Sequence, residues 1–216
     1  MKRAIIRLLV ILGVSCWPGP AQGVIVTIPI EGVVDYVEDL SGALHGAIEV
    51  GDAISGTYTY DSSTPDMDWL WGSESEKVGR YHYFAAPYGI YLSVGELIFQ
   101  SDPGRVNFLV SVVNDFQFGD DFYSIGSSSN SPLSNNTPVE SISWSLRDRD
   151  GTALSSDGLP TMPPVLAEWD ENLLRIYSSR LYGIDGTVTL VQLVPEPSAI
   201  MLFGVGGLMV IRKTTK

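Results

Sequence analysis

The chain has 216 residues, of which 44% are hydrophobic and 18% are charged, and its formal net charge is −12. This charge is unevenly distributed, because residues 24–194 carry 24 acidic against 7 basic residues, a formal charge of −17. A surface this acidic repels polyanions, so the composition excludes nucleic acid as a partner.

The N-terminus predicts a cleavable signal peptide over residues 1–23. A positive start at Lys2 and Arg3 precedes an apolar run, residues 5–14, which is too short to span a bilayer. Small residues at Ala21 and Gly23 predict cleavage by a signal peptidase after Gly23. The mature chain would then begin at Val24 and be exported.

The only cysteine, Cys16, falls inside the predicted signal peptide. Its removal would exclude disulfides, thiol catalysis and thiolate metal sites from the mature chain. An alternative uses Cys16 as a lipid attachment site, since the segment of residues 13–16 loosely resembles a lipobox.

The body, residues 24–193, contains short runs of β-branched and aromatic residues separated by Gly, Asp and Pro. These runs predict strands at 24–30, 53–60, 89–94, 96–99, 106–113, 122–125, 142–146, 173–178 and 186–193. For residues 165–175 we expect a turn into a strand rather than a helix. Together the strands predict one all-β domain, a single antiparallel β-sandwich or jelly roll.

An Asp-Gly pair at Asp150-Gly151 predicts a tight turn, with a hairpin between residues 141–146 and 152–154. The pattern Asp148-x-Asp150-Gly151 also resembles half of a calcium-binding loop. The later oxygen ligands and the closing Glu of such a loop do not follow, so we interpret the segment as a turn and expect no metal.

Aromatic residues are frequent between positions 69 and 88. They are Trp69, Trp71, Tyr81, Tyr83, Phe84 and Tyr88. Exposed indole rings can stack on sugar faces, and Trp69 and Trp71 lie in a segment rich in Gly, Ser and Asp, which makes them candidate glycan-stacking residues. Core packing accounts for the same aromatic residues.

Catalytic motifs are absent from the sequence: it has no Gly-x-Ser-x-Gly elbow, no His-Glu-x-x-His helix and no phosphate loop. Paired carboxylates leave no short motif. Asp115, Asp120 and Asp121 are close in sequence, and we interpret them as solvated loop acids. We therefore expect a non-enzymatic protein without catalytic residues or cofactor.

The last 23 residues have three parts in a fixed order. They are the motif Val194-Pro195-Glu196-Pro197-Ser198, an uncharged run that ends at Ile211, and a basic tail with Arg212, Lys213 and Lys216. This order resembles the PEP-CTERM sorting domain of bacteria that make exopolysaccharide. The resemblance implies recognition by an exosortase, a membrane transpeptidase-like enzyme, at Pro195, Glu196 and Pro197.

The uncharged run of residues 197–211 is expected to form a short transmembrane helix whose basic tail stays on the cytoplasmic face. The segment of residues 51–61 is also similar to a strand that recurs in the β-sandwich bodies of this family. The family resemblance implies a protein that passes through the inner membrane to the cell surface or matrix, in contact with exopolysaccharide or biofilm. Two alternatives are a carbohydrate-binding module that uses Trp69 and Trp71, and a glycan-active enzyme.

Overall fold

The computed structural model describes residues 24–67, 77–116 and 119–192, and these form one antiparallel sheet. The strands are β1 (Ile25–Asp39), β2 (Ala53–Asp61), β3 (Val78–Tyr83), β4 (Gly89–Val94), β5 (Leu97–Gln100), β6 (Phe108–Phe116), β7 (Asp120–Ser127), β8 (Ser141–Asp148), β9 (Glu171–Ser178) and β10 (Tyr182–Val191). Their order in the sheet is β3-β6-β7-β8-β9-β10-β1-β2-β4-β5. The prediction of an all-β, antiparallel body is confirmed.

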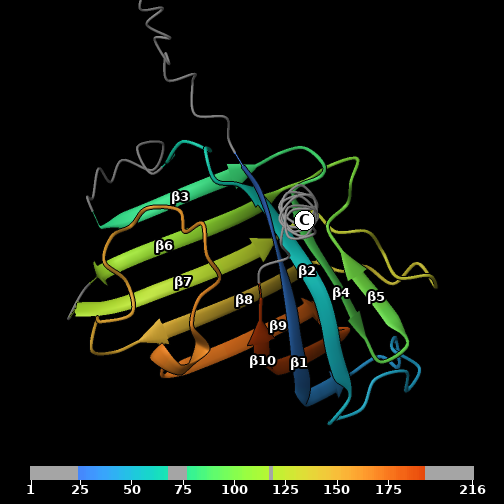
Figure 1. The fold of residues 1–216 in the computed structure, drawn as a ribbon. Helices are drawn as coiled ribbons and strands as arrows, with labels where there is room; N and C mark the ends of the chain where they lie inside the picture. Colours follow the sequence, from blue (N-terminus) through green and yellow to red (C-terminus); the bar gives the residue numbers. More distant parts are fainter. Residues whose placement is uncertain (1–23, 68–76, 117–118, 193–216) are drawn as a thin grey trace, which may run out of the picture.

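The sheet curls into a half-barrel and stays continuous, in place of the two separate packed sheets of the predicted sandwich (Figure 1). Strand β1 is the connection, because it pairs with β2 over residues 25–33 and with β10 over residues 30–39. Its register against β10 shifts after Glu31 and again after Val34. Such bulges bend a strand and increase its twist, which lets one sheet fold over itself.

The core fills the concave side of the curled sheet. Tyr58 of β2 packs against Trp144 of β8 with ring centroids 5.9 Å apart, and the Tyr123 hydroxyl of β7 donates to the Tyr58 hydroxyl over 3.1 Å. Phe99 of β5 lies 6.4 Å from Tyr182 of β10, measured between ring centroids. These buried rings join strands that are not neighbours in the sheet, and truncating one of them would cost about 3 to 5 kcal/mol of stability.

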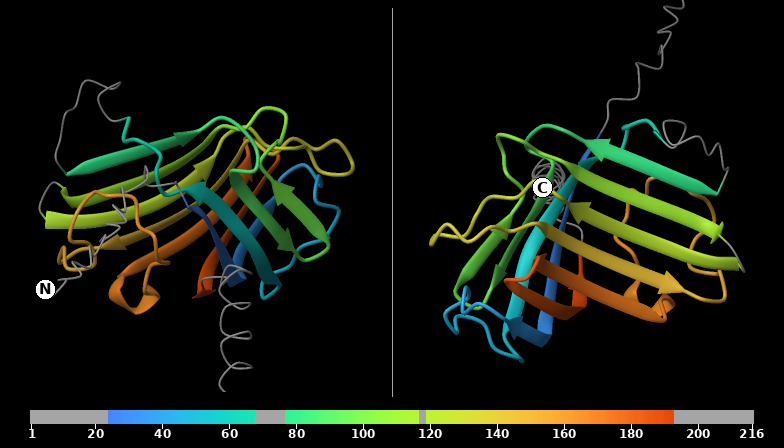
Figure 2. Two further views of the ribbon diagram at one scale, coloured as in Figure 1. Left: turned by 45° about the horizontal axis from the view of Figure 1, so that its top comes forward. Right: turned by 180° about the vertical axis from the view of Figure 1, so that it is seen from behind.

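A long connection, residues 149–170, crosses the inner side of the sheet from β8 toward β3 (Figures 1 and 2). The Tyr60 hydroxyl donates to the Pro160 carbonyl over 2.6 Å, and the Tyr81 hydroxyl donates to the Asp157 carbonyl over 2.9 Å. Burial, and then the charge of Asp66, raise the pKa of Tyr81 to about 12, so its phenol remains a proton donor. The connection is therefore fixed to the core by buried tyrosines.

The observed strands depart from the predicted ones in three places. Strand β1 continues to Asp39, past its predicted end at residue 30, and this extension pairs with β10. Strand β3 was missed, although it pairs with β6 along its whole length. The hairpin expected after β8 is wrong, because β8 pairs with β7 and β9 while residues 152–154 lie outside any strand. Within residues 165–175 a single 3-10 turn at Leu166–Glu168 precedes β9.

Candidate functional site: an uncharged groove on the outer face

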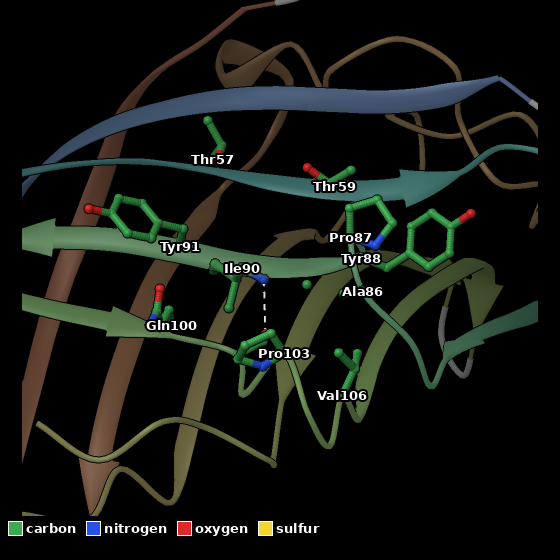
Figure 3. Close-up of a pocket in the computed structure, with 12 residues that line it drawn as sticks. Thr57, Thr59, Ala86, Pro87, Tyr88, Ile90, Tyr91, Gln100, Pro103 and Val106 are labelled. Atoms are coloured by element: carbon green, nitrogen blue, oxygen red, sulfur yellow. Dashed lines mark hydrogen bonds between the residues drawn. The ribbon is translucent and has the colours of Figure 1, made fainter. Parts of the chain in front are cut away.

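A shallow groove of about 200 Å³ lies on the outer face of β2, β4 and β5 (Figure 3). Two connections complete its walls, the one between β3 and β4 and the one between β5 and β6. None of the twelve residues that line it is charged. The lining of the groove therefore differs from the rest of the body, which is rich in carboxylates.

Three polar side chains form a row across the groove. The strand register pairs Thr57 with Tyr91 and Tyr91 with Gln100. All three occupy outward positions, because the residues that alternate with them on β2, β4 and β5 belong to the buried core. Neighbouring strands are about 4.8 Å apart, so the row is about 10 Å long. Tyr91 is 44% exposed.

Some polar side chains of the groove are already hydrogen-bonded within the protein, and others are not. The Thr59 hydroxyl lies 3.1 Å from that of Thr27, and the Ser101 hydroxyl accepts from the Ile90 N–H over 3.0 Å. Within the described part of the chain, by contrast, the side chains of Thr57 and Gln100 make no hydrogen bond. These two side chains are therefore available to a ligand.

Tyr88 lies at the other end of the groove, beside Pro87 (Figure 3). Its ring contacts that of Tyr83, with centroids 5.1 Å apart. Desolvation, and then the charge of Asp61, raise the pKa of Tyr88, so its phenol stays protonated at neutral pH. The groove thus has two aromatic hydroxyls, that of Tyr88 just before β4 and that of Tyr91 within it.

The acids that we expected to be solvated lie elsewhere, at the end of β6 and the start of β7. Asp120 and Asp121 are buried, which contradicts that expectation, whereas Asp115 is exposed as expected. The Asp121 carboxylate accepts from the backbone N–H of Asp115 over 2.8 Å and from that of Leu154 over 2.7 Å. Arg147 donates its Nε–H to the Asp120 carboxylate over 2.8 Å. These contacts replace the water that each carboxylate gives up on burial.

Asp148, the cross-strand partner of Asp121, is buried as well. It accepts from the backbone N–H groups of Thr152 and Ala153 over 2.7 and 2.9 Å, and from that of Asp150 over 3.2 Å. Desolvation raises the pKa of Asp148, but these N–H donors outweigh it and lower the pKa below its usual value. Asp148 therefore holds residues 149–151 in place, where the chain bends and Gly151 has a φ of 67°, but the tight hairpin turn predicted there is not formed.

Most of the site residues predicted from the sequence lie outside the described residues. These are Ala21, Gly23, Trp69, Trp71, Pro195, Glu196, Pro197, Arg212, Lys213 and Lys216. Of the other clustered aromatics, Tyr81 and Tyr83 are buried, and Phe84 is exposed and stacks on His82. Sequence reasoning missed Thr57, Tyr91 and Gln100, although their outward positions follow from the alternation within β2, β4 and β5.

Across residues 24–67, 77–116 and 119–192, no three His, Cys, Asp or Glu side chains are grouped so that they could hold a metal ion. Within these same ranges, no helix has the length and apolar character needed to cross a membrane. No protein-family model, curated protein or solved structure compared with the chain matches it.

Proposed function

We propose that the chain is an exported, non-enzymatic protein of the cell surface or extracellular matrix, sorted by an exosortase and associated with exopolysaccharide or biofilm. One observation carries this proposal: a signal-peptide pattern, an acidic body, a Pro-Glu-Pro motif, an uncharged run and a basic tail follow one another in this order. Any one of these features is common in unrelated proteins. Their order is specific to the resemblance with the PEP-CTERM family.

Each part of the C-terminal segment suits a sorting role. Pro195 and Pro197 disfavour helix and remove backbone N–H donors, which favours an extended motif that an enzyme can reach. The basic tail orients the segment across the membrane. Gly204, Gly206 and Gly207 allow close packing against a partner helix such as that of the processing enzyme.

The position of the last described strand is compatible with trimming at this motif. Strand β10 lies between β9 and β1, and Val191 pairs with Ile30. The Gln192 N–H donates to the Pro29 carbonyl over 3.3 Å. A cut at residues 195–197 would therefore remove no described strand, and the curled sheet would stay whole.

The test is to replace Glu196 with Ala and to follow the size and location of the full chain in a host that has an exosortase. We expect the variant to keep its C-terminal segment and to accumulate in the inner membrane. Glu38→Ala, which changes an exposed acid of β1, is the matched control and should be processed as the parent is. Equal trimming and export of the Glu196 variant and the parent would show that the motif does not direct sorting.

A second candidate function is carbohydrate binding, and the uncharged groove favours it. The stacking residues predicted for it, Trp69 and Trp71, lie outside the described residues, but the groove offers an exposed aromatic ring beside unengaged polar groups. A glycan-active enzyme is less favoured, since Asp121 and Asp148 are engaged by backbone N–H groups.

A further inference from the structure

We propose that the outer-face groove is a binding site for an uncharged hexose polysaccharide, which lies along the row formed by Thr57, Tyr91 and Gln100. This inference deepens the proposed matrix association, on which it rests for the source of the ligand. The groove itself is defined by described residues. It is a different surface from the segment that contains Trp69 and Trp71.

The charge of the groove selects the class of ligand. The body has 24 acidic and 7 basic residues, so its field repels an anionic polysaccharide. A cationic ligand would find no carboxylate among the lining residues, and the Asp61 carboxylate beside the groove is already engaged by Tyr88 and Ser63. An uncharged ligand avoids the repulsion and requires no charged partner.

The hydrogen-bonding groups of the row match a sugar better than a proline-rich peptide. The hydroxyl of Thr57 and the amide of Gln100 can each donate and accept, as sugar hydroxyls also do. The Tyr91 ring adds an exposed apolar face with a hydroxyl at its end. An extended proline-rich peptide has carbonyl acceptors but few N–H donors, so it would leave the acceptors of this row unused.

The groove is also built on rigid elements. Thr57, Tyr91 and Gln100 belong to three strands that are hydrogen-bonded to one another, and buried residues alternate with them. Pro87 and Pro103, which have a fixed φ, stand in the two flanking connections. A site whose backbone is already in place loses less conformational entropy when it binds than one built on mobile loops.

The experiment uses the full chain in a detergent without a sugar headgroup, because an alkyl glycoside would compete for the groove. The probes are cellohexaose, maltohexaose, laminarihexaose, mannohexaose, hexagalacturonate and decaproline, with binding measured by titration calorimetry. We expect at least one of the four uncharged hexasaccharides to bind, and neither hexagalacturonate nor decaproline to do so.

The variants locate the site. Tyr91→Ala and Gln100→Ala should each weaken binding about tenfold, as expected for the loss of one aromatic or polar contact. The controls are Tyr36→Ala and Tyr177→Ala, which remove exposed tyrosines from β1 and β9 and should leave affinity unchanged. Thermal unfolding of every variant verifies that a loss of binding is not a loss of fold.

The inference would be overturned if no uncharged hexasaccharide bound, if hexagalacturonate or decaproline bound, or if the groove and control variants showed equal losses. A loss confined to Trp69→Ala or Trp71→Ala would also overturn it, because it would assign the glycan to that segment. None of these results bears on sorting, which is read from the processing of the Glu196 variant. The two proposals can therefore fail separately.

Discussion

Polar side chains cluster in two regions of the molecule, where the start of β7 meets the end of β8 and on the outer face of β2, β4 and β5. The two regions differ in whether these side chains are hydrogen-bonded within the protein. At the first region, Asp121 and Asp148 are buried and accept two and three backbone N–H groups respectively. At the second, Thr57 and Gln100 have no side-chain partner within the described residues, and Tyr91 is exposed.

A strongly acidic composition therefore does not say where the carboxylates act. A cluster of acids can indicate a binding or catalytic site. Here Asp121 and Asp148 instead accept backbone N–H groups of the connection that follows β8 and hold it in place. The surface best suited to a ligand is one that lacks charge. The following variants test this division between structural and available polar groups.

The largest effect is expected for Asp121→Asn. The N–H groups of Asp115 and Leu154 donate to different oxygens of the carboxylate, and the amide keeps the size of the side chain but replaces one of these oxygens with an NH2 donor. A buried N–H would lose its partner, and the free energy of unfolding should fall by about 2 to 3 kcal/mol. Urea unfolding measures this change. Asp35→Asn, at an exposed acid of β1, is the control, and an equal loss in the control would contradict the structural role of Asp121.

An intermediate effect on stability is expected when the pH is lowered, because Asp148 becomes protonated. Because the N–H donors of Thr152, Asp150 and Ala153 outweigh desolvation, the pKa of Asp148 is lower in the folded than in the unfolded state. Its stabilisation is therefore complete above the unfolded value, about 3.9, and is lost as the pH falls through the lower folded value. Urea midpoints between pH 7 and 2 should fall less steeply below about pH 4 in Asp148→Asn than in the parent. Parallel curves would show that Asp148 does not contribute.

The smallest effect on stability is expected for Tyr91→Ala. The side chain is 44% exposed and has no buried polar partner, so its removal should change the free energy of unfolding by no more than about 0.5 kcal/mol. Tyr177→Ala, at a tyrosine that is 39% exposed, should behave alike. Thermal unfolding compares the two. A much larger loss for Tyr91 would mean that this residue supports the sheet and is not free to serve a ligand.

Local pattern was sufficient for much of the fold. Runs of β-branched and aromatic residues located nine of the ten strands, since alternation between a buried and a solvated face is visible within a few residues. Strand β3 was the exception, because Gly79, Arg80 and His82 interrupt its apolar residues. In the structure, Tyr81 and Tyr83 point into the core, and Arg80 and His82 occupy the opposite face.

The all-β class and the positions of most strands could be predicted from the sequence, because they depend on neighbours along the chain. Three features became visible only in the folded chain: one sheet curls over itself through β1, Asp121 is buried, and Thr57, Tyr91 and Gln100 share a row. The reason is that strand order and register pair residues far apart in the chain, and a shift of one residue would turn each of these side chains to the other face of the sheet.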